Sequence, residues 1–401
     1  MKNIIILGDG MADLPFEKLG GKTPLDVAKK VNLDNLAKNG EIGLVKTVPD
    51  ALKPGSDVAN LAVLGYDPLK YYTGRSPLEA VSMGINMQNN EIALRCNLVT
   101  LSEEGDYENK TMLDYSAGEI TTAESKILIN AVNEALAEDN IKFYPGISYR
   151  HCVIIKDYTI EDDLTPPHDI SDKVIAPYLP KGVHCEKYLS LMKKSFDILK
   201  NHPINIERKN KNLLPANSIW LWGAGKKPIL DSFKNKTGLS GAIISAVDLV
   251  KGIGIAAGMK IYEVEGATGN INTNFQGKAQ TAIKALKEND FVYLHIEAPD
   301  ECGHHGDYEG KVKSIEIIDE KVLAPVKAYL DGLNEDYNLM VLPDHPTPLS
   351  TKTHSKAPVP YMIYRKNKEK GSGFAYNEKN AEKSGIYIEE GYTLIDKLIN
   401  G

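Results

Sequence analysis

Short runs of apolar residues mark the strands that we expect in this chain. Ile4–Leu7, Phe291–Ile296 and Leu339–Leu342 each place apolar side chains at nearly every successive position. A strand that alternates between apolar and polar residues has one face in water, whereas a strand with an unbroken apolar run is covered on both faces. These three runs therefore predict central strands of a mainly parallel sheet with helices on both sides.

Apolar positions at helical spacing separate these strands. Thr23–Gly40 reads as a turn followed by a helix that Gly40 ends, with apolar side chains three and four positions apart. Pro54 and Gly55 form a turn, and a second amphipathic helix follows from Ser56 until Gly65 ends it. The alternation of strands and helices predicts the α/β class, with a doubly wound core.

The pattern changes in the middle of the chain. Glu91–Leu101 and Gly146–Lys156 read as strands with a helix between them at Ile120–Ala137, which suggests a separate α+β unit. Ser218–Trp222 then reads as a strand and Gly241–Ala257 as a helical stretch. We therefore predict a core in two parts, residues 1–86 and 213–401, and an inserted cap domain, residues 87–212.

Composition and charge narrow the class of protein. The 401 residues are 42% hydrophobic and 25% charged with a net charge of -7, which argues against nucleic acid or an acidic membrane as the main partner. No apolar run approaches the ~20 residues of a transmembrane helix. The four cysteines have no C-x-x-C spacing, which fits reduced thiols. We expect a cytoplasmic protein that binds a small metabolite.

Aspartate and histidine follow the predicted strands. Asp9 follows the first strand, Asp300 and His304 the second, and Asp344, His345 and His354 the third. A lone histidine is usually structural, and an aspartate beside glycines is often a turn residue. Several such residues at the carboxyl ends of parallel strands, however, converge on one edge of the sheet. Oxygen and imidazole ligands suit Mn²⁺, Zn²⁺, Mg²⁺ or Fe²⁺, so we predict a metal site there.

Two other residue types suggest chemistry. Ser56 stands at a helix start, where it would either cap the helix or act as a nucleophile facing free backbone N–H groups. The chain contains only five arginines. We expect some of them at sites where a planar guanidinium binds a carboxylate or phosphate through two hydrogen bonds. Arg150 with His151, in a predicted cap strand, is the most suggestive pair, although a charged cross-strand partner is the alternative.

The sequences of several segments resemble the motifs of a known protein family. GDGMAD, PGSDVANLAVLGYDP, YYTGRSPLEA, EAPDECGHHGD and DHPTPLSTKTHS look like the archaeal-type cofactor-independent phosphoglycerate mutases of the alkaline phosphatase superfamily. The resemblance covers nearly the whole chain and is weakest in the cap. It implies two divalent cations, with Mn²⁺ preferred and Zn²⁺, Mg²⁺ or Co²⁺ as alternatives. It assigns one cation to Asp9, Ser56, Asp344 and His345, and the other to Asp300, His304 and His354.

The same resemblance implies an activity. Ser56 would take the phosphoryl group from 3-phosphoglycerate and return it to the other hydroxyl of the bound glycerate, giving 2-phosphoglycerate without 2,3-bisphosphoglycerate. The matching positions assign substrate binding to Arg150, Arg95 and Arg75, phosphoryl contact to Lys226, and proton transfer to His151 or Asp114. Where relatives carry a basic residue after Asp114, this chain has Glu119.

Three alternatives stay open at this point. A phosphohydrolase would use the same serine and metals and differ only in letting water reach the phosphoserine. A homoserine kinase-like phosphotransferase is the second, although the chain lacks a G-x-x-x-x-G-K-[ST] loop. A non-catalytic binding protein is the third. The sequence leaves the oligomeric state and the preferred metal undetermined.

Overall fold

The computed structural model describes residues 1–367 and 371–401. The chain divides into two compact units. The first consists of Met1–Tyr72 and Ile229–Gly401, and the second is Thr73–Pro228, inserted between these parts. Among the described residues, no helix has both the length and the apolar content needed to cross a bilayer.

An eight-stranded sheet forms the centre of the first unit, in the order β13-β2-β12-β11-β1-β10-β8-β9. β1 lies between two parallel neighbours, β10 and β11, and β8 and β9 extend the parallel arrangement. Among the described strands of this sheet, β12 alone is antiparallel, and it pairs in this way with both β11 and β2. The strands are β1 (Lys2–Gly8), β2 (Glu41–Val45), β8 (Gly241–Ile244), β9 (Lys260–Ile261), β10 (Phe291–Ile296), β11 (Tyr337–Leu342), β12 (Val359–Arg365) and β13 (Tyr387–Ile388).

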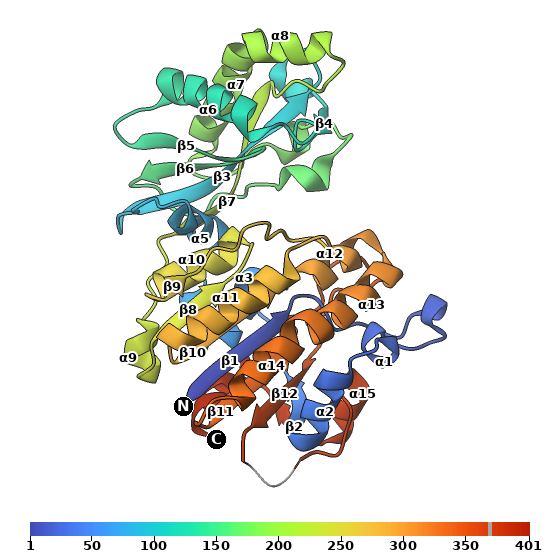
Figure 1. Ribbon diagram of the computed structural model, residues 1–401. Helices are drawn as coiled ribbons and strands as arrows, with labels where there is room; N and C mark the ends of the chain where they lie inside the picture. The colour runs from blue at the N-terminus through green and yellow to red at the C-terminus, as the bar shows by residue number, and fades with distance from the viewer. Residues whose placement is uncertain (368–370) are drawn as a thin grey trace. The chain divides into compact units, whose positions relative to one another are not determined.

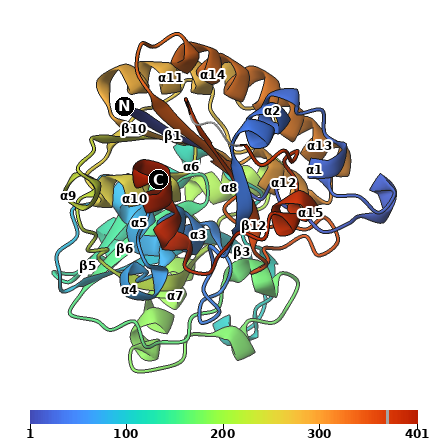
Figure 2. The same ribbon diagram turned by 90° about the horizontal axis from the view of Figure 1, so that it is seen from below.

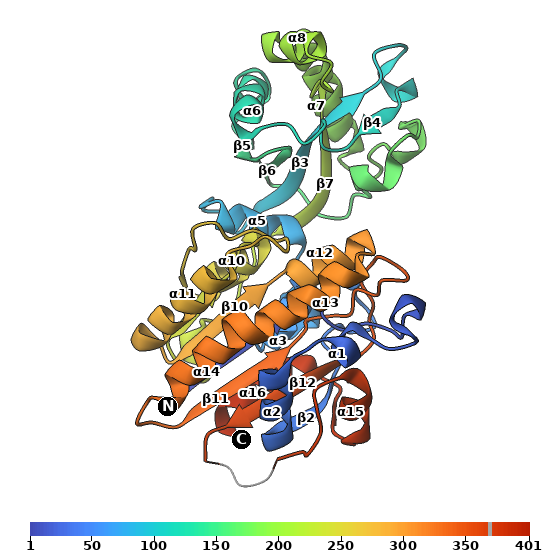
Figure 3. The same ribbon diagram turned by 45° about the vertical axis from the view of Figure 1, so that its right-hand side comes forward.

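Helices cover both faces of this sheet. Figures 1 and 2 show α11 and α14 on one side of β1 and β10, and Figure 2 shows α3 and α10 on the other. The described helices of this unit are α1 (Pro24–Val27), α2 (Val31–Asn39), α3 (Ser56–Val63), α4 (Pro68–Tyr71), α9 (Phe233–Thr237), α10 (Asp248–Ala256), α11 (Phe275–Glu288), α12 (Ala298–His305), α13 (Tyr308–Ile317), α14 (Ala324–Asp331), α15 (Glu378–Lys383) and α16 (Leu394–Asn400), with short turns η1 (Glu17–Leu19) and η6 (Gly391–Thr393). The π-helical stretch η5 (Ile318–Leu323) joins α13 to α14, so the three run on as one helix in Figure 3.

The core of this unit explains why β1 is apolar throughout. Ile4 and Ile6 pack in one cluster with Ala282 and Leu286 of α11 and Val326 of α14, while Ile5 and Leu7, on the opposite face, are also fully buried. Burial of both faces requires an apolar residue at every position of the strand. The predicted α/β fold with a doubly wound, mainly parallel core is confirmed.

The second unit is an α+β body around a five-stranded antiparallel sheet, in which β3 pairs with β4, β6 and β7, and β5 pairs with β6. One side of this sheet packs on α6 and α7 through a continuous apolar cluster. The elements are α5 (Arg75–Ser82), β3 (Glu91–Leu101), η2 (Tyr107–Asn109), β4 (Met112–Asp114), α6 (Thr122–Leu136), β5 (Ile141–Ile147), β6 (Arg150–Lys156), η3 (Pro167–Ile170), η4 (Ala176–Tyr178), α7 (Cys185–Leu199), α8 (Pro203–Asn210) and β7 (Ser218–Lys226).

The boundaries of this unit differ from the predicted insertion, residues 87–212. The observed unit extends further at both ends, to Thr73 and to Pro228. At the first end, Glu79 of α5 accepts hydrogen bonds from the Arg95 side chain in β3. At the other end, β7 pairs with β3 along its length. Both contacts join residues far apart in sequence, so the local pattern could not show them.

The helix expected before Gly40 is confirmed as α2, which has Gly40 as its cap, and the turn expected before it is the four-residue helix α1, which ends where Ala28 is extended with ψ 137°. Two other predicted elements need correction. The strand expected at Gly146–Lys156 is the end of β5, a turn with Ser148 at φ 53°, and β6. The stretch Gly241–Ala257, expected to be helical, begins with strand β8, and only its second half is helix α10. A four-residue apolar run fits either type of element.

Candidate metal centre and nucleophile

Three neighbouring parallel strands direct acidic residues to one edge of the first unit's sheet. Asp9 follows β1, Asp344 follows β11, and Asp300 lies in α12, the helix that follows β10. Because these strands are parallel and adjacent, their carboxyl ends meet. The side chains of Asp9, Asp300 and Asp344 are all at least nine-tenths buried there.

One group of possible ligands consists of Asp300, His304 and His354. His304 Nε2 lies 3.2 Å from Asp300 Oδ2, and His354 Nε2 lies 3.5 Å from Asp300 Oδ1. The two histidines approach each other with 2.9 Å between their Nε2 atoms. The hydrogen bond to Asp300 raises the pKa of His304 to about 9. Two imidazole nitrogens and a carboxylate facing one point form an N/O ligand set.

A second group shares Asp300 with the first and adds Asp9 and His345. His345 Nε2 lies 3.8 Å from Asp9 Oδ1 and 3.4 Å from Asp344 Oδ2. Asp344 is held by the backbone N–H of Gly10, at 3.1 Å from Oδ1, and by the Asn60 side-chain amide, at 3.0 Å from Oδ2. The carboxylate of Asp344 is therefore fixed in orientation before any ligand arrives.

The electrostatics of Asp9 fit a bound cation. Burial raises the pKa of Asp9 well above its usual value, and the nearby carboxylates of Asp344 and Asp300 raise it further. Its Oδ1 atom is buried and has no hydrogen-bond partner among the described residues. A buried, unpartnered carboxylate oxygen is costly, and a divalent cation would supply both the missing contact and the missing charge. The residues present therefore fit the metal site that the sequence predicts.

Ser56 is the first residue of α3, and the helix is capped by Gly55 without a side-chain hydrogen bond. The capping alternative for Ser56 is thus wrong, since the cap position belongs to its neighbour. The Ser56 hydroxyl lies 3.2 Å from His345 Nε2 instead. Its half-buried side chain stands at the positive end of the helix dipole, beside the second group of possible ligands.

Two residues that the sequence did not single out support this arrangement. His295, in β10, places its Nε2 atom 2.9 Å from Asp9 Oδ2, and its Nδ1 atom lies 3.2 Å from the Ser245 hydroxyl. Asn60, on α3, joins Asp344 and accepts a hydrogen bond from Tyr293 at 2.5 Å. A polar histidine inside an apolar strand was the available signal for His295.

The chain is similar along its whole length to known phosphoglycerate mutases. The family model described as 2,3-bisphosphoglycerate-independent phosphoglycerate mutase matches residues 37–205. A probable 2,3-bisphosphoglycerate-independent phosphoglycerate mutase of Geobacter sulfurreducens is 47% identical over 401 residues, covering 100% of both chains. The mutase of Methanosarcina barkeri is also 47% identical over 401 residues, covering 100% of this chain and 99% of the relative.

The chain belongs to the 2,3-bisphosphoglycerate-independent phosphoglycerate mutase family. Solved structures agree. A protein of Pyrococcus horikoshii superposes with a TM-score of 0.82 at 28% identity, covering 100% of this chain and 96% of that one. The cofactor-independent phosphoglycerate mutase of Thermoplasma acidophilum gives a TM-score of 0.67 at 25% identity, covering 100% and 99%. The family resemblance read from the sequence motifs is confirmed.

Arg95 and Arg75, two of the arginines that we expect to bind the substrate, both donate hydrogen bonds to the carboxylate of Glu79 in the second unit. Arg95 donates to Glu79 through Nε at 2.7 Å, and Arg75 Nε donates to Glu79 at 3.1 Å. Burial would raise the pKa of Glu79, but the charges of Arg95 and Arg75 outweigh it and lower that pKa to about 2. The Arg95 guanidinium also lies over the ring of Trp222, 4.6 Å from its centre. These contacts hold Arg95 in place.

The other cap residues have different surroundings. Arg150 is exposed, with its guanidinium 5.4 Å from the centre of the Tyr149 ring, and Lys226 is exposed at the end of β7. His151 is buried, which lowers its pKa to about 3, and its Nδ1 atom accepts the Gly146 N–H at 2.9 Å. Arg150 and Lys226 are therefore open to solvent within this unit, whereas His151 is enclosed.

Asp114 holds a tight loop. One of its carboxylate oxygens accepts hydrogen bonds from the Ser116 N–H and hydroxyl, both at 2.7 Å, and from the Gly118 N–H at 3.0 Å. Ala117 and Glu119 in this loop have φ values of 50° and 52°. The carboxylate stabilises a backbone conformation that non-glycine residues seldom adopt.

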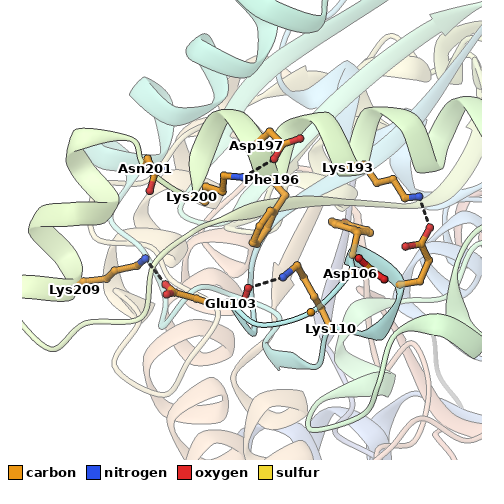
Figure 4. A pocket seen from close by; sticks show the side chains of 12 residues that line it. Glu103, Asp106, Lys110, Lys193, Phe196, Asp197, Lys200, Asn201 and Lys209 are labelled. Atoms are coloured by element: carbon orange, nitrogen blue, oxygen red, sulfur yellow. Dashed lines mark hydrogen bonds and ion pairs between the residues drawn. The ribbon is translucent and has the colours of Figure 1, made fainter.

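A cavity of about 670 Å³ lies elsewhere in the second unit, against α7 and the loop before β4 (Figure 4). Its walls carry four lysines and four acidic residues. Lys193 pairs with Glu108, and Lys209 with Glu103. The lysine charges are thus matched by acidic side chains in the same walls, and a charged ligand would have to displace existing pairs. The candidate metal centre, where a buried carboxylate oxygen of Asp9 has no hydrogen-bond partner among the described residues, therefore remains the stronger candidate site.

Proposed function

We propose that this protein interconverts 3-phosphoglycerate and 2-phosphoglycerate through a phosphoserine at Ser56, without 2,3-bisphosphoglycerate. The observation that carries the proposal is the position of the Ser56 hydroxyl. It stands at the start of α3, 3.2 Å from His345 Nε2, which in turn lies near the buried carboxylates of Asp9 and Asp344. The names of the full-length relatives support phosphoglycerate as the substrate and independence of 2,3-bisphosphoglycerate.

The chain's own groups suit an in-line transfer. The Ser56 oxygen would attack phosphorus as the bond to the substrate oxygen breaks, and the reverse step would return the group to the neighbouring hydroxyl of glycerate. The backbone N–H groups in the first turn of α3 point toward a phosphate on Ser56, and the helix dipole favours its negative charge. His345 borders the attacking oxygen, and its Nε2 atom lies 3.4 Å from Asp344, which Gly10 and Asn60 hold in place.

We propose two divalent cations, with Mn²⁺ preferred over Zn²⁺, Mg²⁺ and Co²⁺. Asp9, Ser56, Asp344 and His345 would hold one, and Asp300, His304 and His354 the other. When bound, such cations lower the pKa of the serine hydroxyl and offset the charge of the transferring phosphoryl group. The unpartnered Asp9 Oδ1 and the group of Asp300, His304 and His354 support this assignment, whereas the second group joins Asp9 and His345 to Asp300 and does not include Asp344.

For the substrate we propose a role first for Arg150. It is exposed and has no ion pair with any residue that the structure describes, so its guanidinium can grip a carboxylate in a bidentate manner. Arg95 and Arg75 would add positive charge while Glu79 holds them. Phosphoryl contact by Lys226 and proton transfer by His151 or Asp114 stay predictions, as does the cytoplasmic location.

The kinase alternative is not favoured by the relatives.

The test is conversion of 3-phosphoglycerate by metal-loaded protein without 2,3-bisphosphoglycerate, with free phosphate followed in parallel and a chelator control. We expect chelator-sensitive isomerisation with little phosphate release. Phosphate release alone would make the protein a phosphohydrolase, and no reaction would direct the search to homoserine with ATP.

Ser56→Ala should abolish transfer. Ser232→Ala is the matched control, because Ser232 also stands at a helix start in the first unit, where its hydroxyl accepts the Asn235 N–H. Loss of that cap costs about 1 kcal/mol of stability and should leave turnover unchanged. Near-normal turnover of Ser56→Ala would remove the phosphoserine from the mechanism.

A further inference from the structure

Thr347 touches both groups of possible metal ligands with a single hydroxyl. It lies in the loop after β11 and is fully buried. Its Oγ1 atom makes a short hydrogen bond to Asp300 Oδ1 and lies 3.3 Å from His345 Nδ1. Asp300 belongs to both groups, with His304 and His354 in the first and with Asp9 and His345 in the second, and His345 also adjoins Ser56. No other described side chain bonds to both residues in this way.

The chemistry of the three groups fixes the direction of these hydrogen bonds. An ionised carboxylate only accepts, so the one hydroxyl proton of Thr347 goes to Asp300. The Thr347 oxygen then accepts the proton of His345 Nδ1. With Nδ1 protonated, His345 Nε2 presents its lone pair toward the Ser56 hydroxyl, 3.2 Å away, and toward Asp9. Thr347 thereby selects the tautomer of His345 that can act as a ligand.

Packing prevents Thr347 from turning away. A Cβ atom on Gly10, whose φ is +61°, would stand 2.6 Å from Thr347 Oγ1, and one on Gly303 would stand 2.6 Å from the Thr347 carbonyl oxygen. That carbonyl accepts a hydrogen bond from the buried Lys311 ammonium at 2.8 Å. Lys311 also pairs with Asp13 at 2.6 Å. The close packing around Thr347 and the hydrogen bond to its carbonyl oxygen therefore keep its hydroxyl between Asp300 and His345.

We propose that Thr347 is a positioning residue that couples the two metal groups. Its hydroxyl holds the orientation of Asp300, which both groups share, together with that of His345, so a cation that fixes either residue also orients a ligand for the other cation. Filling one group then favours filling the other. The inference rests on the proposed function only in taking these two groups as cation sites.

The experiment compares Thr347→Val, which keeps the shape and removes the hydroxyl, with Thr347→Ser, which keeps the hydroxyl. Metal-stripped full-length protein is titrated with Co²⁺, followed by calorimetry and by the visible absorption of bound cobalt. Thr351→Val is the matched control, because Thr351 lies in the same loop, is exposed, and has its hydroxyl 3.4 Å from the Pro348 carbonyl.

We expect the wild type to take up two equivalents of Co²⁺ in one linked step. Thr347→Val should lower the affinity by about 10- to 100-fold and separate the two steps, and Thr347→Ser should restore both. If Thr347→Val does not fold, Thr347→Ala removes the hydroxyl without adding bulk. Wild-type affinity and linkage in the folded Val or Ala variant would overturn the coupling.

This readout is independent of catalysis. Wild-type protein that binds two linked equivalents of Co²⁺ but makes no 2-phosphoglycerate would overturn the proposed function and leave the coupling standing. Mutase activity together with unlinked cobalt binding would support the proposed function and overturn the coupling.

Discussion

His295 Nε2 lies 2.9 Å from Asp9 Oδ2, while the other oxygen of Asp9 is buried with no hydrogen-bond partner in the described part of the chain. Burial lowers the pKa of His295 to about 3, so its imidazole is neutral at pH 7. With one proton to donate, it donates to the carboxylate and accepts the Ser245 hydroxyl proton at Nδ1. The bond orients Asp9 so that Oδ1 faces the ligand group.

Replacing His295 should therefore weaken cation binding. A glutamine amide reaches roughly the position of Nε2 and keeps the donor to Asp9, whereas an asparagine amide is too short. We expect His295→Asn to lose about 10- to 100-fold in Mn²⁺ affinity and His295→Gln to lose much less, measured by calorimetry. Equal losses in the two variants would contradict an orienting role.

Metal binding should depend on His304 and not on its neighbour His305. His305 is three-quarters exposed, and its Nδ1 atom lies 2.9 Å from the Glu301 carbonyl oxygen, away from the ligand group. At 100 times the dissociation constant, a cation stabilises the folded state by about 2.7 kcal/mol. We expect Mn²⁺ to raise the melting temperature of the wild type and of His305→Gln, and to raise that of His304→Gln less. Equal shifts in both variants would rule out His304 as a ligand.

The buried Lys311–Asp13 pair should be a large contributor to stability. Both side chains are almost fully buried, with 2.6 Å between Lys311 Nζ and Asp13 Oδ2. Removing one partner leaves an uncompensated buried charge, so Lys311→Met should lower the free energy of unfolding by about 3–5 kcal/mol in urea. Lys313, two residues on, forms an exposed pair with Glu316 at 3.3 Å. Lys313→Met should cost under about 1 kcal/mol, and a similar cost for both variants would contradict this account.

Glu79 should make the protein sensitive to acid. Its pKa is lowered to about 2 in the folded state by Arg95 and Arg75 despite burial, against 4.5 ordinarily. The folded state therefore binds fewer protons than the unfolded one, and the stability from this group is present above pH 4.5 and lost as the pH falls toward 2. The contribution at pH 7 is at most about 3 kcal/mol. The wild type should exceed Glu79→Gln in stability at pH 7, and the difference should shrink by pH 3. A difference independent of pH would point to packing alone.

The sequence predicted those parts of the site that depend on single strands. Asp9 and Asp344 each follow a buried apolar run, and the edge of a parallel sheet brings such positions together whatever the loops do. Thr347 and His295 could not be found in this way. Their roles depend on contacts with Asp300 and Asp9, which lie 47 and 286 positions away along the chain.

The errors in the fold have the same physical origin. The ends of the second unit are set by Glu79 on Arg95 and by the pairing of β7 with β3, both long-range contacts. The turn between β5 and β6 depends on the positive φ of Ser148, which a serine adopts only when its surroundings hold it. Ser148 Oγ donates to the Ile120 carbonyl oxygen at 2.7 Å, and its N–H donates to Thr122.

The order of strands in the first sheet has a consequence for synthesis on the ribosome. β1 emerges first, yet both its neighbours, β10 and β11, begin only at Phe291 and Tyr337. Every strand partner in the second sheet, by contrast, lies between Glu91 and Lys226. The inserted unit can thus complete its pairing while the apolar strand at the N-terminus still has two open edges, each a template for pairing with another chain. Nascent chains stalled before Phe291 would consequently be the form most in need of a chaperone.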